Sequence, residues 1–101
     1  MPTGEEIIIK TDDVRVRIVE LAAQEVAALH RHSEVTDNMF CLTGRMSVRV
    51  KDPDEEFFLR PGERCTVARG RAHQVVNANP GRATYLLVQG VGKYDFDAVK
   101  P

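Results

Sequence analysis

Short segments in which apolar and polar residues alternate follow one another along most of this chain. Val14, Val16 and Ile18 alternate with two arginines, and residues 46–50 repeat the pattern. A period of two is typical of a strand with one buried face, so we expect these three apolar side chains to face the core.

Turn-forming residues separate these segments. Asp52-Pro53-Asp54, Pro61-Gly62 and Asn79-Pro80-Gly81 each interrupt the chain between two apolar runs. Short strands at this spacing predict an all-β fold, a small antiparallel barrel or sandwich. A chain of 101 residues has the size of one domain, so residues 1–101 are expected to form a single domain.

One segment favours a different local structure. Residues 18–29 are rich in Ala, Glu, Gln and Leu, which have high helix propensity. We nevertheless expect an extended chain, because no helix-capping residue precedes the histidine pattern that follows, and that pattern requires a strand.

Charge and composition exclude several classes of protein. The net charge is −1 and the two signs are interspersed, so nucleic acid is not an expected partner. No apolar run approaches the roughly 20 residues of a membrane span, and residues 1–6 lack the pattern of a signal peptide. We therefore expect a cytoplasmic protein in which Cys41 and Cys65 are reduced.

All three histidines lie in two short patterns, and histidine is otherwise absent from the chain. His30 and His32 are two residues apart, so on a strand both imidazoles point to the same face. Asp37 follows after a segment suited to a turn, and His73 lies in a second pattern. A lone histidine is more often an ordinary surface or core residue, but the combination predicts a metal site formed by His30, His32, Asp37 and His73.

Neutral imidazoles bind divalent transition ions and leave coordination positions open, which permits Lewis-acid or redox chemistry. Zinc, iron, manganese, nickel and copper all accept such a site. Asp37 is our candidate catalytic residue, and three roles stay open for it: metal ligand, hydrogen-bond acceptor for a histidine, or general base.

These residues resemble the cupin superfamily, whose first motif reads Gly, five residues, His-x-His, three or four residues, Glu, six residues, Gly. His30, His32, Asp37 and Gly44 stand at those intervals. The second motif reads Gly, five residues, Pro-x-Gly, two residues, His, three residues, Asn. Its positions here are Gly62, Ala68, Gly70, His73 and Asn77. The resemblance implies a small jelly-roll barrel with one metal site.

Three positions depart from the motifs. Gln24 replaces the opening glycine, Ala68 replaces the proline, and Asp37 replaces the usual Glu. The first two changes affect turn geometry. The third shortens the side chain by one methylene, about 1.5 Å, which favours a role for Asp37 beside the ion over a place among its ligands.

A substrate pocket is predicted beside the metal. If β-pairing continues without a bulge from Asp37, the side chains of Met39, Cys41 and Thr43 face inward with it. The full set of predicted pocket residues is Met39, Cys41, Cys65, Asn77 and Tyr85.

Further residues outside the predicted pocket set are candidates for closing the pocket or for contacting a ligand or a second subunit. Tyr94 and Phe96 are expected to close the pocket or to contact a second subunit. Arg69, Arg71 and Arg82 surround turns, where they either guide an anionic ligand or are simply solvated.

Two functions remain open. The first is a metal-dependent isomerase, lyase or oxygenase that acts on a small carboxylated or sugar-derived molecule, as the resemblance to small uronate-converting cupins and cupin oxygenases implies. The second is a binding or sensing protein with a structural metal. The resemblance also implies a homodimer, for which Ile7-Ile8-Ile9 is an exposed apolar edge strand.

Overall fold

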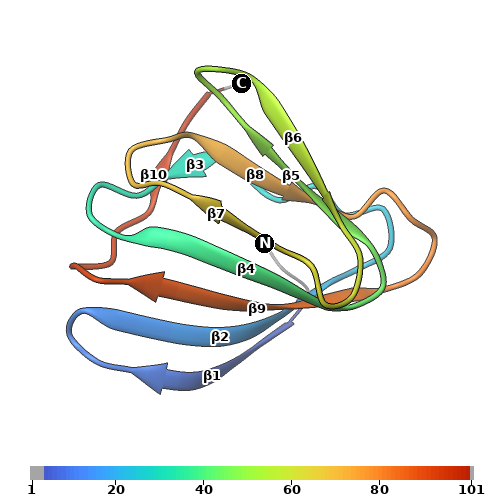
Figure 1. Ribbon diagram of the computed structural model, residues 1–101, viewed down its shortest axis with the longest axis horizontal. Helices are drawn as coiled ribbons and strands as arrows, with labels where there is room; N and C mark the ends of the chain where they lie inside the picture. The colour runs from blue at the N-terminus through green and yellow to red at the C-terminus, as the bar shows by residue number, and fades with distance from the viewer. Residues whose placement is uncertain (1–3, 101) are drawn as a thin grey trace.

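The computed structural model describes residues 4–100, which form ten β-strands in two five-stranded sheets. Figure 1 shows β1, β2, β9, β4 and β7 in one sheet and β10, β3, β8, β5 and β6 in the other. Every strand pair is antiparallel. The all-β prediction is therefore confirmed.

The strands follow closely on one another along the chain. Their bounds are β1 Gly4–Lys10, β2 Val14–Leu21, β3 His30–Arg31, β4 Thr36–Thr43, β5 Met46–Val50, β6 Glu55–Leu59, β7 Arg64–Val67, β8 His73–Val76, β9 Ala83–Gly90 and β10 Asp97–Ala98. Within residues 4–100, no helix has the length and apolar character that a membrane crossing requires.

Long-range pairing places strands from the N-terminal and C-terminal parts of the chain side by side. Strand β9 lies between β2 and β4, and β3 lies between β10 and β8. The segment that carries the first histidine pattern is thus held next to both the second pattern and the C-terminal part of the chain. A jelly roll of this kind has a core between its sheets, and the buried residues supply it from both.

Strand β2 shows the predicted alternation of apolar and polar residues, but the prediction of which face is buried is wrong. Val19 and Leu21 are buried and lie on the same face of β2 as Arg15 and Arg17. The alternating apolar residues Val14, Val16 and Ile18 lie on the opposite face. The inner face begins with arginines because it borders a cavity at this end, and it becomes apolar only where the sheets pack together.

The segment after β2 is not helical, as expected, although it is not a regular strand either. Between Leu21 and His30 only Val26 makes a ladder contact, with Val76 of β8. Gln24 has a φ of 61°, a conformation that glycine adopts more readily than other residues. Gln24 therefore keeps the backbone conformation that suits the motif glycine it replaces.

The end of β4 departs from the simple alternation. A register shift between Cys41 and Thr43 leaves the Thr43 side chain exposed, so its predicted inward orientation is wrong. The next turn uses Gly44 at a φ of 74°, and a Cβ there would collide with the carbonyl oxygen of Arg82. Only glycine fits this position without a backbone shift.

Candidate metal centre

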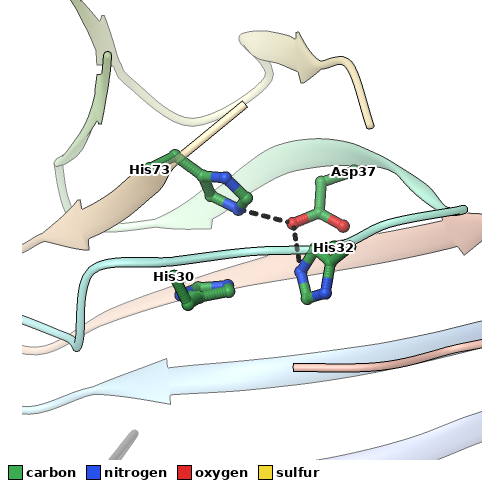
Figure 2. A group of neighbouring side chains, drawn as sticks. All are labelled: His30, His32, Asp37 and His73. Carbon is green, nitrogen blue, oxygen red and sulfur yellow. Dashed lines mark hydrogen bonds and ion pairs between the residues drawn. The ribbon is translucent and has the colours of Figure 1, made fainter. Parts of the chain in front are cut away.

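Strands from both sheets bring the four predicted ligands together. His30 in β3 is paired directly with His73 in β8, while Asp37 comes from β4 of the other sheet. His32 follows β3. Figure 2 shows the Asp37 carboxylate between the rings of His32 and His73, with the His30 ring beside them.

The candidate ligand atoms lie close enough to share one ion. One atom from each of the four residues lies within 4.8 Å of the others. Oδ2 of Asp37 is 2.9 Å from Nε2 of His73 and 3.3 Å from Nε2 of His32. Ligand atoms at about 2.1 Å around a tetrahedral ion are roughly 3.4 Å apart, so the shorter aspartate still reaches such a position.

Backbone carbonyls orient each imidazole. Nδ1 of His30 lies 2.9 Å from the carbonyl oxygen of Ala28, and Nδ1 of His73 lies 2.9 Å from that of Arg71. Nδ1 of His32 contacts the carbonyl oxygen of Asp95. A carbonyl oxygen only accepts, so Nδ1 is the donor in each ring and, in the neutral imidazole, Nε2 carries a free lone pair.

This arrangement requires a positive charge at the centre. The lone pairs of two Nε2 atoms face an ionised carboxylate, and acceptors at these distances repel unless a proton or a metal ion lies between them. The donor set of three imidazoles and one carboxylate suits a divalent transition ion. Carbonyl acceptors behind ligating histidines are also usual in metal sites.

Gln89 extends the polar group along the sheet. This side chain is 1% exposed, and its Nε2 donates to Oδ1 of Asp37 at 3.0 Å. The same nitrogen is 3.4 Å from Nε2 of His32. Gln89 therefore holds the second carboxylate oxygen and leaves Oδ2 to the histidines.

The protonation of the group reflects both burial and the Asp37 charge. Burial lowers the pKa of His30 to about 4, which keeps this imidazole neutral at neutral pH. Burial alone would also lower the pKa of His32, but its hydrogen bond to Asp37 and the charge of that residue outweigh burial and raise it. Burial opposes ionisation of Asp37, yet the hydrogen bonds from His32 and His73 hold its pKa well below the usual range.

The group opens onto a cavity of about 370 Å³. The lining side chains that bear on function come from β1, β2, β4 and β9, from β3 with the residue that follows it, and from the C-terminal segment: Glu5, Arg15, Arg17, His30, His32, Asp37, Met39, Tyr85, Leu87, Gln89, Tyr94 and Phe96. Its volume is near the lower end of that of small-molecule sites, which is about 300 to 1,000 Å³.

The structure separates the predicted pocket residues. Met39 and Tyr85 line the cavity. Cys41, Cys65 and Asn77 do not, which corrects the prediction for these three residues.

The three predicted pocket residues that do not line the cavity lie in the core or stabilise a turn. The two cysteines are free and buried within the core, and burial raises the pKa of Cys65 to about 11, which keeps its thiol protonated at neutral pH. Asn77 donates to the carbonyl oxygens of Ala22 and Gly81 and fixes the turn after β8.

Aromatic residues of the C-terminal segment lie over the histidines. The Phe96 ring stacks on His30 with a centroid separation of 4.3 Å. The Tyr94 ring is 5.4 Å from that of His32. Both residues line the cavity.

Sequence reasoning missed Arg15, Arg17 and Gln89 as cavity residues. The alternation of β9 contained a signal for Gln89, because this residue shares the face of Tyr85 and Leu87. The arginines were assigned to the outer face because polar residues in alternating strands usually face water. In contrast, Arg69, Arg71 and Arg82 do not line the cavity.

Comparison with known proteins supports the same architecture. Residues 17–89 match the family model of the cupin domain. No curated protein sequence matches the chain.

Several solved structures share the fold. An uncharacterised conserved protein with a double-stranded β-helix domain from Klebsiella pneumoniae has a TM-score of 0.84 at 17% identity, covering 97% of this chain and 84% of that one. KdgF from Halomonas sp. has a TM-score of 0.75 at 18% identity, covering 88% and 80%. An oxalate oxidase has a TM-score of 0.81 at 18% identity, covering 98% and 57%. At these identities the likeness concerns the fold alone.

Proposed function

This chain belongs to the cupin domain family, and from that premise we propose that it is a metal-dependent enzyme acting on a small carboxylated or sugar-derived substrate. The observation that carries the proposal is the position of the ligand group at a cavity. His30, His32 and Asp37 all line that cavity, so an ion held there would be accessible to a small molecule. A purely structural site would be closed on all sides.

The three histidines would hold the ion, with Asp37 beside it or as a further ligand, and the ion would supply Lewis-acid or redox chemistry according to its identity among zinc, iron, manganese, nickel and copper. The chain's own groups would orient the substrate, exclude water and move protons. Asp37 is the candidate proton carrier, because its Oδ2 faces the histidine nitrogens at the cavity wall. Isomerase, lyase and oxygenase reactions are all compatible with such a group.

The alternative function is a binding or sensing protein in which the metal is structural. The burial of His32, Asp37 and His73 favours this role, because three of the four residues of the group lie within the protein. Such a protein would bind a small ligand and release it unchanged.

Metal content and turnover together test the proposal. Protein purified without a histidine tag would be analysed for metals and then assayed with uronates, 2-keto acids and dicarboxylates, with oxygen uptake recorded. We expect one ion per chain and turnover that His73→Ala abolishes. Gln74→Ala is the matched control, because this neighbour points away from the group. Turnover that survives His73→Ala in a folded protein would eliminate the enzyme, and ligand binding without turnover would favour the alternative.

We also propose a homodimer in a reducing compartment such as the cytoplasm. β1 is an edge strand of its sheet, and Ile7, Ile8 and Ile9 are 52%, 46% and 50% exposed. Burying this apolar strand against a second copy would remove it from water. The free thiols of Cys41 and Cys65 fit a reducing environment.

A further inference from the structure

Two arginines stand in the wall of the cavity, one strand beyond Gln89. In the sheet register, Arg15 of β2 is opposite Gln89 of β9, which in turn is opposite Asp37 of β4. Directly opposed residues share a face, so the three side chains form one polar row. Neighbouring strands are about 4.8 Å apart, which places the backbones of Arg15 and Asp37 roughly 10 Å apart across the row.

Arg17 lies two residues further along the same face, with donors that are only partly satisfied. Its side chain is 11% exposed. Nη1 donates to Glu5 at 2.8 Å, and Nη2 donates to Oε1 of Gln89 at 2.8 Å. Nε is buried, and no acceptor for it occurs among residues 4–100. Buried donors are almost always paired in folded proteins, so this one indicates a missing acceptor, either water or a ligand.

Arg15 is held differently. Its guanidinium stacks over the Tyr94 ring at 3.8 Å from the centroid, and in the described part of the chain no carboxylate lies within ion-pairing distance of it. Stacking fixes the plane of the guanidinium and leaves its edge donors free. Tyr94 also approaches His32, so one aromatic residue positions Arg15 beside the metal group.

The charges of this wall do not balance. Two guanidinium groups face one carboxylate, that of Glu5, while the Asp37 carboxylate is engaged by Gln89 and the histidines. One positive charge is left over in a partly enclosed cavity, where electrostatic attraction is stronger than in water. A single carboxylate matches this excess, whereas a phosphate monoester carries about −1.5 to −2 at neutral pH.

We propose that Arg15 and Arg17 form an anion subsite that binds one carboxylate of a small ligand, whose other end lies against the histidine and aspartate group. This inference rests on the proposed function and narrows its substrate class to molecules with a carboxylate at one end and an oxygen function at the other. The planar guanidinium edge matches the two oxygens of a carboxylate. Two anchor points would fix the direction in which the ligand lies in the cavity.

Binding of simple acids tests the subsite. Metal-free and Co²⁺-loaded protein would be titrated with acetate, succinate and the neutral analogue succinamide, with the NMR signals of arginine Nε–Hε groups and calorimetry as readouts. We expect succinate to bind more tightly than acetate to the loaded form, and succinamide to bind to neither form. Arg15→Met should weaken succinate roughly 10- to 100-fold, as expected when a hydrogen bond to a charged group is lost.

Matched variants separate this role from general effects of charge. Arg64→Met removes an arginine that also lies over an aromatic ring, that of Phe40, but does not line the cavity, so it should bind succinate like the wild type. Arg17→Met provides a second test of the subsite. The visible spectrum of bound Co²⁺ should be preserved in all three variants, because none of them alters a ligand.

The outcomes distinguish the two proposals. Succinate binding that is unchanged in both Arg15→Met and Arg17→Met would overturn the subsite and leave the metal site standing. Tighter binding of inorganic phosphate than of succinate would also overturn it. Failure of the wild type to take up Co²⁺, together with acetate binding that depends on Arg15, would support the subsite and overturn the metal-dependent function.

Discussion

Nε2 of His73 lies 2.9 Å from Oδ2 of Asp37, although the carbonyl oxygen of Arg71 fixes the donor proton of this imidazole on Nδ1. Two acceptors facing each other inside the protein are stable only with a cation between them. A divalent ion placed between them would supply this positive charge. Because the pKa of His32 is raised and a ligating imidazole must be neutral, metal binding is expected to release a proton.

Asp37→Asn tests what the carboxylate contributes. The substitution removes the negative charge that raises the pKa of His32, so this pKa should fall in the metal-free variant. If Asp37 carries protons, metal affinity should decrease by no more than about 10-fold while turnover is lost. NMR titration of the His32 ring and metal analysis measure the two effects.

Two results would contradict this role. Loss of metal in parallel with activity would make Asp37 a ligand. An unchanged His32 pKa would show that the contact between the two side chains is absent in solution. Asp54→Asn, in the exposed turn after β5, is the control for loss of one negative charge.

The stability of the metal-free protein should depend on pH through His30. Its pKa is lowered from 6.5 to about 4 by burial, so between these values the unfolded chain binds a proton that the folded chain does not. The free energy of unfolding should therefore fall as pH decreases from 6.5 to 4, by at most about 1.4 kcal/mol per pH unit from this residue.

Neighbouring groups do not produce this slope. The stabilising effect of His32, whose pKa is raised, is already complete below pH 6.5, and that of Asp37 is lost only below its unfolded value of 3.8. Urea unfolding of wild type and His30→Gln across this range measures the difference. Parallel curves for the two proteins would show that His30 titrates normally.

Alanine substitutions at three glycines distinguish the effect of a positive φ from the effect of a close backbone neighbour. Gly44 combines a positive φ with a close backbone neighbour, Gly62 has a positive φ with open space around it, and Gly81 has neither. Substitution by Ala should cost more than about 2 kcal/mol at Gly44, about 1 kcal/mol at Gly62 and close to nothing at Gly81. Urea unfolding gives these values, and a tolerated Gly44→Ala would mean that the turn before β5 adjusts freely.

Self-association is expected to depend on the exposed edge strand β1. Ile9→Lys places a charge on this strand and should convert the dimer into a monomer in sedimentation velocity experiments. Phe58→Lys is the matched control, because Phe58 is 75% exposed on β6, an edge strand of the other sheet. A monomeric wild type at micromolar concentration would exclude the proposed dimer.

Much of the architecture follows from local sequence. Alternation and turn residues predicted strands in an all-β fold, and His30, His32, Asp37 and His73 were identified from their spacing together with the resemblance to the cupin motifs. Gln24 shows why such motifs tolerate exceptions. A non-glycine residue adopts its positive φ at a modest cost when the surrounding strands fix the backbone.

What the sequence determined by itself was the periodicity of the strands and the placement of His30 and His32 two residues apart, because both depend on the geometry of a strand. Only the tertiary structure decided which face of β2 turns inward, and it placed Arg15 and Arg17 in the cavity with the Gln89 side chain beside them. A strand presents two faces that local sequence cannot rank when one of them borders a cavity. That choice depends on the sheet packed opposite, which only the whole fold supplies.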